Sequence, residues 1–188
     1  MIPWRRALPA AFLLLAVTAC SSGTPTGTTA EDNPVGDIPD NQAFVPFTPT
    51  GGLFTVSVPE GWSRSGDGAD VTFTDKLTSI HVEQRAAASA PTVASVRDTV
   101  LPGLRSSAKG FQEDTVKAAT RKAGDVVVLT YHADSAPDPV TGKSVAQDLE
   151  RYEYFHSGQS VVLTFAAPKG SDNVDPWRTV TDSLSWSK

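Results

Sequence analysis

The sequence predicts an α+β domain in which two main helices pack on an antiparallel β-sheet. Three observations lead to this prediction. Several short stretches alternate apolar and polar residues, which is the period of half-buried strands, and two longer stretches repeat apolar residues every three or four positions, as helices do. Along the chain, strands are followed by a helix, a run of strands and a last helix, which is the order of an α+β domain.

The composition supports one such domain with additional terminal segments. The chain has 188 residues, of which 39% are hydrophobic, and a formal net charge of −5. This length fits a single domain of about 100–150 residues plus tails. An acidic chain is a poor general ligand for nucleic acid or anionic lipid, since both attract basic surfaces. The sequence therefore predicts no nucleic-acid partner.

The predicted domain spans residues 51–188 and begins with three strands. Residues 54–58 alternate apolar and polar side chains, and the Pro-Glu-Gly sequence at 59–61 turns the chain. Residues 70–75 and 79–85 alternate in the same way, and the short link between them predicts a hairpin.

The first main helix is expected over residues 90–108. Its apolar residues follow the helical period: Val93, Val96, Val100 and Leu104. The Pro102-Gly103 pair should kink or end this helix, because proline lacks the N–H that a helix interior needs.

The second half of the domain predicts an antiparallel meander and a closing helix. Residues 125–134 and 159–168 are apolar on both faces, and 144–157 are mixed. The joins between these stretches resemble hairpin turns. Asp175-Pro176 then predicts the start of the last helix, since an N-cap residue followed by proline favours the first turn.

Residues 1–19 have the organisation of a lipoprotein signal peptide. Residues 1–6 form a short region with two basic side chains, Arg5 and Arg6, and 7–17 form an apolar run that is too short to span a membrane. The sequence Val-Thr-Ala-Cys at 17–20 resembles the bacterial lipobox. This resemblance implies that the sulfur of Cys20 receives a diacylglyceryl group and that cleavage leaves Cys20 as the acylated N-terminus. Apart from these acyl groups, we expect no cofactor. An ordinary secretory signal with an incidental cysteine is the alternative.

Residues 20–50 are expected to be the lipidated cysteine and a disordered tether. Residues 21–50 are rich in Pro, Gly, Ser and Thr and contain no basic side chain, a composition that buries too little apolar surface to fold. A flexible chain of this length reaches about 30 Å. The apolar residues Phe44, Val45 and Phe47 at its end are candidates for docking on the domain. The mature protein is thus expected at the cell membrane, anchored by lipid on the extracytoplasmic side.

Residues 51–187 resemble the PsbP/Mog1-like fold. The resemblance is carried by FTVSVPEGW at 54–62, the hairpin that follows, the meander, and PWRTVTDSL at 176–184. More narrowly, the chain resembles the small actinobacterial cell-envelope lipoproteins built on this fold. The resemblance implies a non-enzymatic accessory or binding factor, and it supplies no catalytic residues.

Three residues form a candidate metal site. His132 and Asp134 share one face of a strand, and a symmetric hairpin would place His132 opposite Asp148. A histidine with two carboxylates can hold a divalent metal. A solvated ion pair near the end of a hairpin is the commoner arrangement for such a group.

A second candidate is a stripe on the strand at 144–157. Tyr152, Tyr154 and His156 share one face of this strand. Such side chains are favoured at protein interfaces, so the stripe is a candidate interaction surface. The alternative is a row packed beneath the C-terminal helix. His81, by contrast, is expected on a solvated strand face with Glu83 and Arg85.

No catalytic signature is found in the sequence. It contains no G-x-S-x-G motif, and the Gly/Asp turn at 65–70 lacks the spacing of a calcium or phosphate loop. The leading hypothesis is a non-catalytic binding or accessory module for an envelope or transport component, such as a transporter. The alternatives are a carrier of small molecules or lipids, with a pocket between the first helix and the strands, and a metal-dependent or hydrolytic enzyme.

Overall fold

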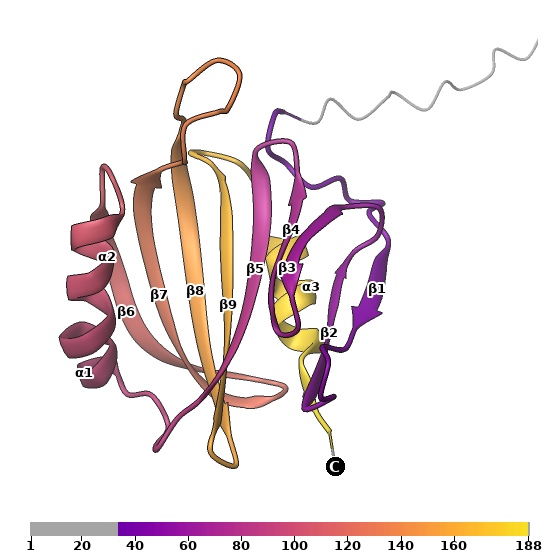
Figure 1. Cartoon of the computed structure of the whole chain (residues 1–188), viewed down its shortest axis with the longest axis vertical. Helices are drawn as coiled ribbons and strands as arrows, with labels where there is room; N and C mark the ends of the chain where they lie inside the picture. The colour runs from indigo at the N-terminus through magenta and orange to yellow at the C-terminus, as the bar shows by residue number, and fades with distance from the viewer. Residues whose placement is uncertain (1–33, 188) are drawn as a thin grey trace, which may run out of the picture. The chain divides into compact units, whose positions relative to one another are not determined.

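A computed structural model describes residues 34–187 (Figure 1). The expected signal peptide and the lipidation site Cys20 lie outside the described residues. In the described part, ten strands form one three-stranded and one seven-stranded sheet. None of the described helices is both long and apolar enough to cross a bilayer.

The elements follow the order of an α+β domain. The strands are β1 (Phe44–Phe47), β2 (Phe54–Pro59), β3 (Ser63–Asp67), β4 (Asp70–Asp75), β5 (Thr78–Ala86), β6 (Gln112–Arg121), β7 (Gly124–Asp134), β8 (Ala146–His156), β9 (Gln159–Pro168) and β10 (Ser185–Trp186). The helices are α1 (Val93–Ser95), the π-helical turn η1 (Val96–Val100), α2 (Leu101–Ser107) and α3 (Val174–Ser183).

The large sheet is antiparallel throughout, which confirms the predicted class. Its strand order is β3-β4-β5-β9-β8-β7-β6, so the predicted hairpin β4–β5 adds to the edge of the meander through β5 and β9. The single expected sheet is in fact accompanied by a second one, in which β2 pairs with β1 and with β10.

The two faces of the large sheet are covered differently. One face is apolar and packs against α3 and the small sheet, with Phe54, Phe165 and Val180 fully buried between them. On the other face, α1, η1 and α2 lie over β6 and β7, around Leu101, Leu129 and Tyr131. Over β4, β5, β9 and β8 this second face carries no helix (Figure 1).

The folded domain begins before residue 51, so the prediction of a disordered tether up to residue 50 is wrong for residues 34–50. The side chain of Ile38 is only 4% exposed, and its N–H donates to Asn173 Oδ1 at 2.7 Å. The apolar residues at 44–47 dock as β1, and Phe47 packs edge-on against Phe73. The composition of residues 34–50 is polar on average, but a few apolar residues among them are sufficient to hold this segment on the domain.

The first main helix is irregular next to Pro102, where a kink or an end was expected. Leu101 donates its N–H to the carbonyl of Val96, which is the wider hydrogen-bond pattern of a π turn. Pro102 follows directly in the first turn of α2, where a backbone N–H is not needed. The helix therefore continues past Pro102 to Ser107 instead of ending there.

Candidate functional site

The structure brings together two of the three candidate metal ligands. His132 and Asp148 are paired across β7 and β8, as the symmetric hairpin predicted, and His132 Nδ1 lies 2.6 Å from Asp148 Oδ1. Asp134 instead faces Gly110, where an added Cβ would lie 3.1 Å from its carboxyl group. Within residues 34–187, no three His, Cys, Asp or Glu side chains are grouped so that they would hold a metal ion.

The His132–Asp148 pair lines an acidic pocket of about 250 Å³ beside the start of α3. Asp114 and Glu150 add two further carboxylates to this pocket. Asp114 is directed here by a β-bulge between Glu113 and Thr115, a feature that redirects a side chain and that strand alternation cannot predict. Each of the three carboxylates already accepts a hydrogen bond. Thr130 donates to Asp114 at 2.8 Å, Tyr152 donates to Glu150 at 2.5 Å, and the Gly170 N–H donates to Asp148 at 2.8 Å. These hydrogen bonds give the carboxylates of the pocket a structural role at the polar edge of the hydrophobic core.

Two residues of the Tyr152–Tyr154–His156 stripe, the tyrosines, pack beneath α3. Tyr152 and Tyr154 are buried, and the hydroxyl of Tyr154 donates to the carbonyl of Thr181 on α3 at 3.0 Å. His156 stacks on Trp186 at the end of the row, with ring centroids 5.2 Å apart. The two tyrosines are therefore not accessible to a partner. They form part of the packed row beneath the C-terminal helix that was the alternative expectation.

The burial of these tyrosines predicts alkaline unfolding. Burial, together with the hydrogen bond to Glu150, raises the pKa of Tyr152 to about 12, and burial also raises the pKa of Tyr154. The pKa of tyrosine in the unfolded chain is about 10. Because the pKa is higher in the folded protein, the contribution of these tyrosines to stability is complete below about pH 10 and is lost as the pH rises through the folded pKa. We expect the melting temperature to fall between pH 10 and pH 12, and less steeply in Tyr152→Phe. Equal slopes for both proteins would contradict this prediction.

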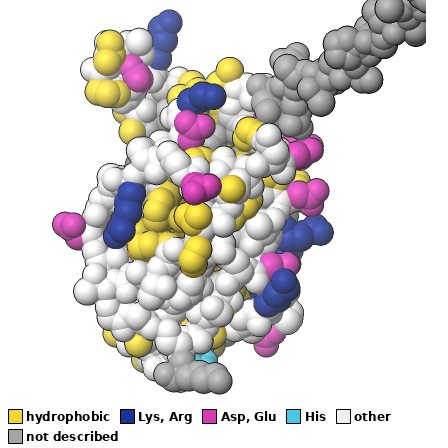
Figure 2. All heavy atoms as spheres, turned by 90° about the vertical axis from the view of Figure 1, so that its right-hand side faces the viewer, with side chains coloured by type: hydrophobic (Ala, Val, Ile, Leu, Met, Phe, Trp, Pro, Cys, Tyr) yellow, Lys and Arg dark blue, Asp and Glu magenta, His cyan; other side chains and the backbone are white. Residues whose placement is uncertain are grey.

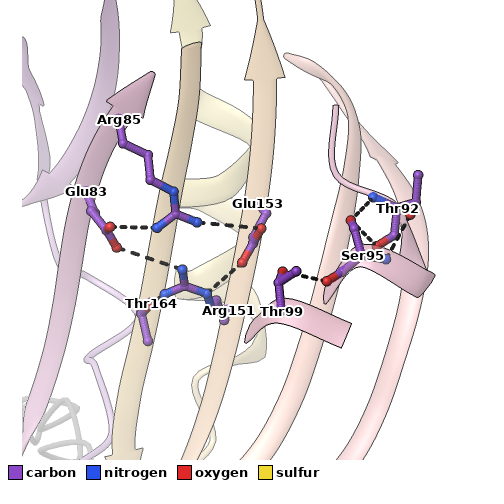
Figure 3. Close-up of polar contacts among 8 residues, drawn as sticks. All are labelled: Glu83, Arg85, Thr92, Ser95, Thr99, Arg151, Glu153 and Thr164. Carbon is purple, nitrogen blue, oxygen red and sulfur yellow. Dashed lines mark hydrogen bonds and ion pairs between the residues drawn. The ribbon is translucent and has the colours of Figure 1, made fainter. Parts of the chain in front are cut away.

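The helix-free part of the second sheet face carries a ring of charged side chains (Figure 3). Arg151 contacts Glu153 at 2.9 Å and Glu83 at 3.8 Å, while Arg85 contacts Glu83 at 2.7 Å and Glu153 at 4.0 Å. Figure 3 shows the two arginines between the two glutamates, so the four charges cancel. Arg151 also donates to Thr164 of β9 at 3.3 Å.

The ring covers an apolar residue that no helix protects. Val162 of β9 is paired with Glu83 on one side and with Glu153 on the other, and its side chain is only 1% exposed. The stems of long charged side chains can cover apolar surface in this way while their ends stay polar. The ring thus closes the sheet surface without a packed element above it.

The ring belongs to a larger surface, which we name the polar face. It consists of side chains of β4, β5, β8 and β9 on the helix-free area: Asp70, Thr72, Thr74, Ser79, His81, Glu83, Arg85, Gln147, Arg151, Glu153 and Thr164. His81 pairs with Asp70 across β4 and β5 at 2.8 Å, in agreement with the solvated strand face expected for it. At one end, the loop 135–145 and the turn at 76–77 border a hollow of about 670 Å³.

A second hollow lies where the carrier hypothesis placed a pocket. It measures about 710 Å³ and is bordered by Pro91, Thr92 and Val93 at the start of α1 and by β6 and β7. Thr92 and Ser95 close this helix start reciprocally, since the side chain of each accepts a hydrogen bond from the backbone N–H of the other (Figure 3). The hollow has a mixed polar and apolar lining with Thr120 and Asp125 at its rim, so nothing in its chemistry selects a lipid.

Comparisons with known proteins identify the fold. The sequence matches no family model, and no curated protein matches it. A cyanobacterial PsbP protein from Synechocystis superposes with a TM-score of 0.52 and 14% identity over 87% of this chain and 100% of its own. The Ran-binding protein Mog1p of Saccharomyces cerevisiae gives 0.51 and 9%, over 77% of this chain and 96% of its own. The fold is PsbP/Mog1-like.

A third similar structure belongs to a longer protein. A protein from Bacteroides thetaiotaomicron gives a TM-score of 0.50 and 14% identity over 76% of this chain. The match covers 48% of the Bacteroides chain, so the present chain spans about half of it. At these identities the likeness establishes the fold alone.

Proposed function

We propose that the chain is a lipoprotein of the outer side of the cytoplasmic membrane, anchored through Cys20, whose domain is a non-catalytic accessory module that binds an envelope protein. The observation that carries the binding part of this proposal is the polar face. It is a helix-free sheet surface whose charged groups are already held in position by one another.

The chemistry of the polar face fits a protein partner better than a small ligand. A sheet surface spreads its side chains over a broad area, and its arginines, glutamates and hydroxyl groups offer both donors and acceptors. Pre-positioned charges contribute more to selecting the correct partner and its register than to affinity. Mog1p, which has the same fold, is described as a Ran-binding protein, so this architecture is compatible with binding a protein.

A tether makes weak binding sufficient. A domain held at the membrane meets membrane proteins at a high effective concentration, so that modest contacts still give high occupancy. An accessory module for a membrane protein, such as a transporter, therefore needs no deep pocket or catalytic group.

The anchor is tested by replacing its sulfur. In Cys20→Ser expressed behind an ordinary secretory signal, we expect the protein to move from the membrane fraction to the soluble extracytoplasmic fraction almost completely, because two acyl chains together provide the anchor. Fractionation and mass analysis of the N-terminal peptide from the native host give the measurement. An unmodified Cys20, or a Cys20→Ser protein that stays in the membrane fraction, would contradict the anchor.

The binding surface is tested by photo-crosslinking in living cells. A photoreactive amino acid at Thr72 or His81, both on the polar face, should capture the same envelope protein. The matched control is Lys117, an exposed residue on the opposite face of the same sheet. Capture of that protein from Lys117 as well, or no capture from either polar-face position, would reject the polar face as the binding surface.

A further inference from the structure

Four segments that are distant in sequence meet at one end of the domain. Thr78 Oγ1 and Asn173 Nδ2 both donate to the carbonyl of Gly36, at 2.8 and 2.9 Å. Gln147, next to the loop 135–145, donates to the carbonyl of Leu77 at 3.3 Å. Figure 1 shows these segments together at the upper end, where the described chain begins. We name this end, made of residues 34–38, 75–78, 135–145 and 168–174, the anchor end.

Exposed apolar side chains are concentrated at the anchor end. Among the described residues, the large apolar side chains with high exposure are Val35, Val45, Leu53, Leu77, Val140 and Val174. All except Val45 and Leu53 belong to the anchor end. Val140 lies in the loop 135–145 and is 90% exposed, and Figure 2 shows hydrophobic side chains on the loop that projects at the top.

The length of chain that precedes the domain keeps this end close to the anchor. Residues 21–33 separate Cys20 from Pro34, the first described residue. A flexible segment of this length has a root-mean-square span of about 20 Å and a limit of about 45 Å when fully extended. Because residues 34–50 are folded, the tether is much shorter than its composition suggested. A lipidated Cys20 therefore holds the anchor end within reach of the bilayer surface.

We infer that the anchor end rests on the bilayer, with the side chains of Val35, Leu77 and Val140 inserted among the lipid headgroups. This inference rests on the proposed lipid anchor. Apolar insertion, not charge, drives the contact, because the lysines of this end (Lys76, Lys143 and Lys169) are accompanied by a larger number of acids (Asp37, Asp75, Asp138 and Asp172). In this orientation the strands of the polar face run away from the membrane. The polar face then stands upright beside the lipid, facing a neighbouring membrane protein.

The depth of Val140 in the membrane tests this inference. Because Cys20 is the only cysteine and its sulfur is acylated in the mature protein, Val140→Cys introduces the only free thiol. The full mature lipoprotein is labelled there with an environment-sensitive dye and reconstituted into phosphatidylcholine vesicles that contain brominated lipid. The control label is at Lys122→Cys, in the exposed β6–β7 turn at the opposite end. We expect about twofold stronger quenching at position 140 than at position 122.

A pair of matched leucines separates apolar insertion from simple proximity. Leu77 and Leu53 are exposed to similar degrees, 39% and 42%, but only Leu77 belongs to the anchor end. Leu77→Asp should reduce the quenching at position 140, while Leu53→Asp should not. Vesicle flotation is measured on the same samples. If the protein floats with the vesicles and positions 140 and 122 are quenched equally, or if Leu77→Asp has no effect, the inference is overturned and the lipid anchor stands. If the protein does not float, the anchor fails and the inference fails with it.

Discussion

Deleting residues 21–50 while keeping Cys20 should unfold the domain, whereas deleting residues 21–33 should leave it folded. The longer deletion removes β1 and the buried side chains of Ile38 and Phe47. Loss of a buried Ile or Phe side chain costs about 2–5 kcal/mol, and domains of this kind are stable by only about 5–15 kcal/mol in total. Urea unfolding of the two deletion proteins, followed by circular dichroism, measures the difference.

Two single substitutions control this experiment. Ile38→Ala should lower the free energy of unfolding by about 2–4 kcal/mol, because it empties a buried site. Val45→Ala, in the exposed part of the same segment, should change it by less than about 0.5 kcal/mol. If residues 51–188 alone unfolded at the same urea concentration as the longer protein, residues 34–50 would be an appendage and the boundary expected from composition would be restored.

The elements that the sequence predicted best are those with a regular period and local partners. The strands β2, β4, β5, β7, β8 and β9 follow from alternation or apolar runs, and the closing helix follows from its apolar period. This helix begins at Val174 with Asn173 as its N-cap, so the expected N-cap Asp175 lies inside its first turn. The pairing of His132 with Asp148 followed as well, because a hairpin fixes the register of its two strands. In each case the information lies within a short stretch of chain.

The elements that escaped prediction depend on partners far away in sequence. In β3 all five residues are exposed, so this edge strand has no apolar alternation to detect. In β1 the proline at position 46 would normally argue against a strand, and it is tolerated because β1 pairs on one side only, with β2. The bulge that directs Asp114 into the acidic pocket leaves no signal in the sequence.

The polar face shows the same limit at the level of the candidate site. Alternation in β5 placed Glu83 and Arg85 on one solvated face, but Arg151 and Glu153 come from β8, beyond β9. Only the pairing of β5 with β9, and of β9 with β8, brings the four side chains together over Val162. Such pairing joins residues that are far apart in the chain, and one sequence does not reveal it.

Arg151→Ala should lower the free energy of unfolding by about 2–4 kcal/mol, because it leaves the carboxylate of Glu153 without its nearest partner. The side chain of Glu153 is only 7% exposed, and Arg85, the remaining cation, is 4.0 Å away. The matched control is Arg97→Ala. Arg97 contacts Glu113 at the same 2.9 Å but is 49% exposed, so its loss should cost less than about 1 kcal/mol. Urea denaturation of the two variants and the unmodified protein provides the comparison.

The double variant Arg151→Met with Glu153→Leu separates the stability of the ring from its role in binding. Replacing both charges with apolar side chains of similar size removes the unpaired carboxylate and still covers Val162, so most of the lost stability should return. The same variant should lose the crosslink from Thr72, since the charges that align a partner on the polar face are gone. A stable double variant that keeps the crosslink would show that the ring only covers the sheet. If Arg151→Ala were no more destabilising than Arg97→Ala, the ring would be a set of ordinary surface ion pairs.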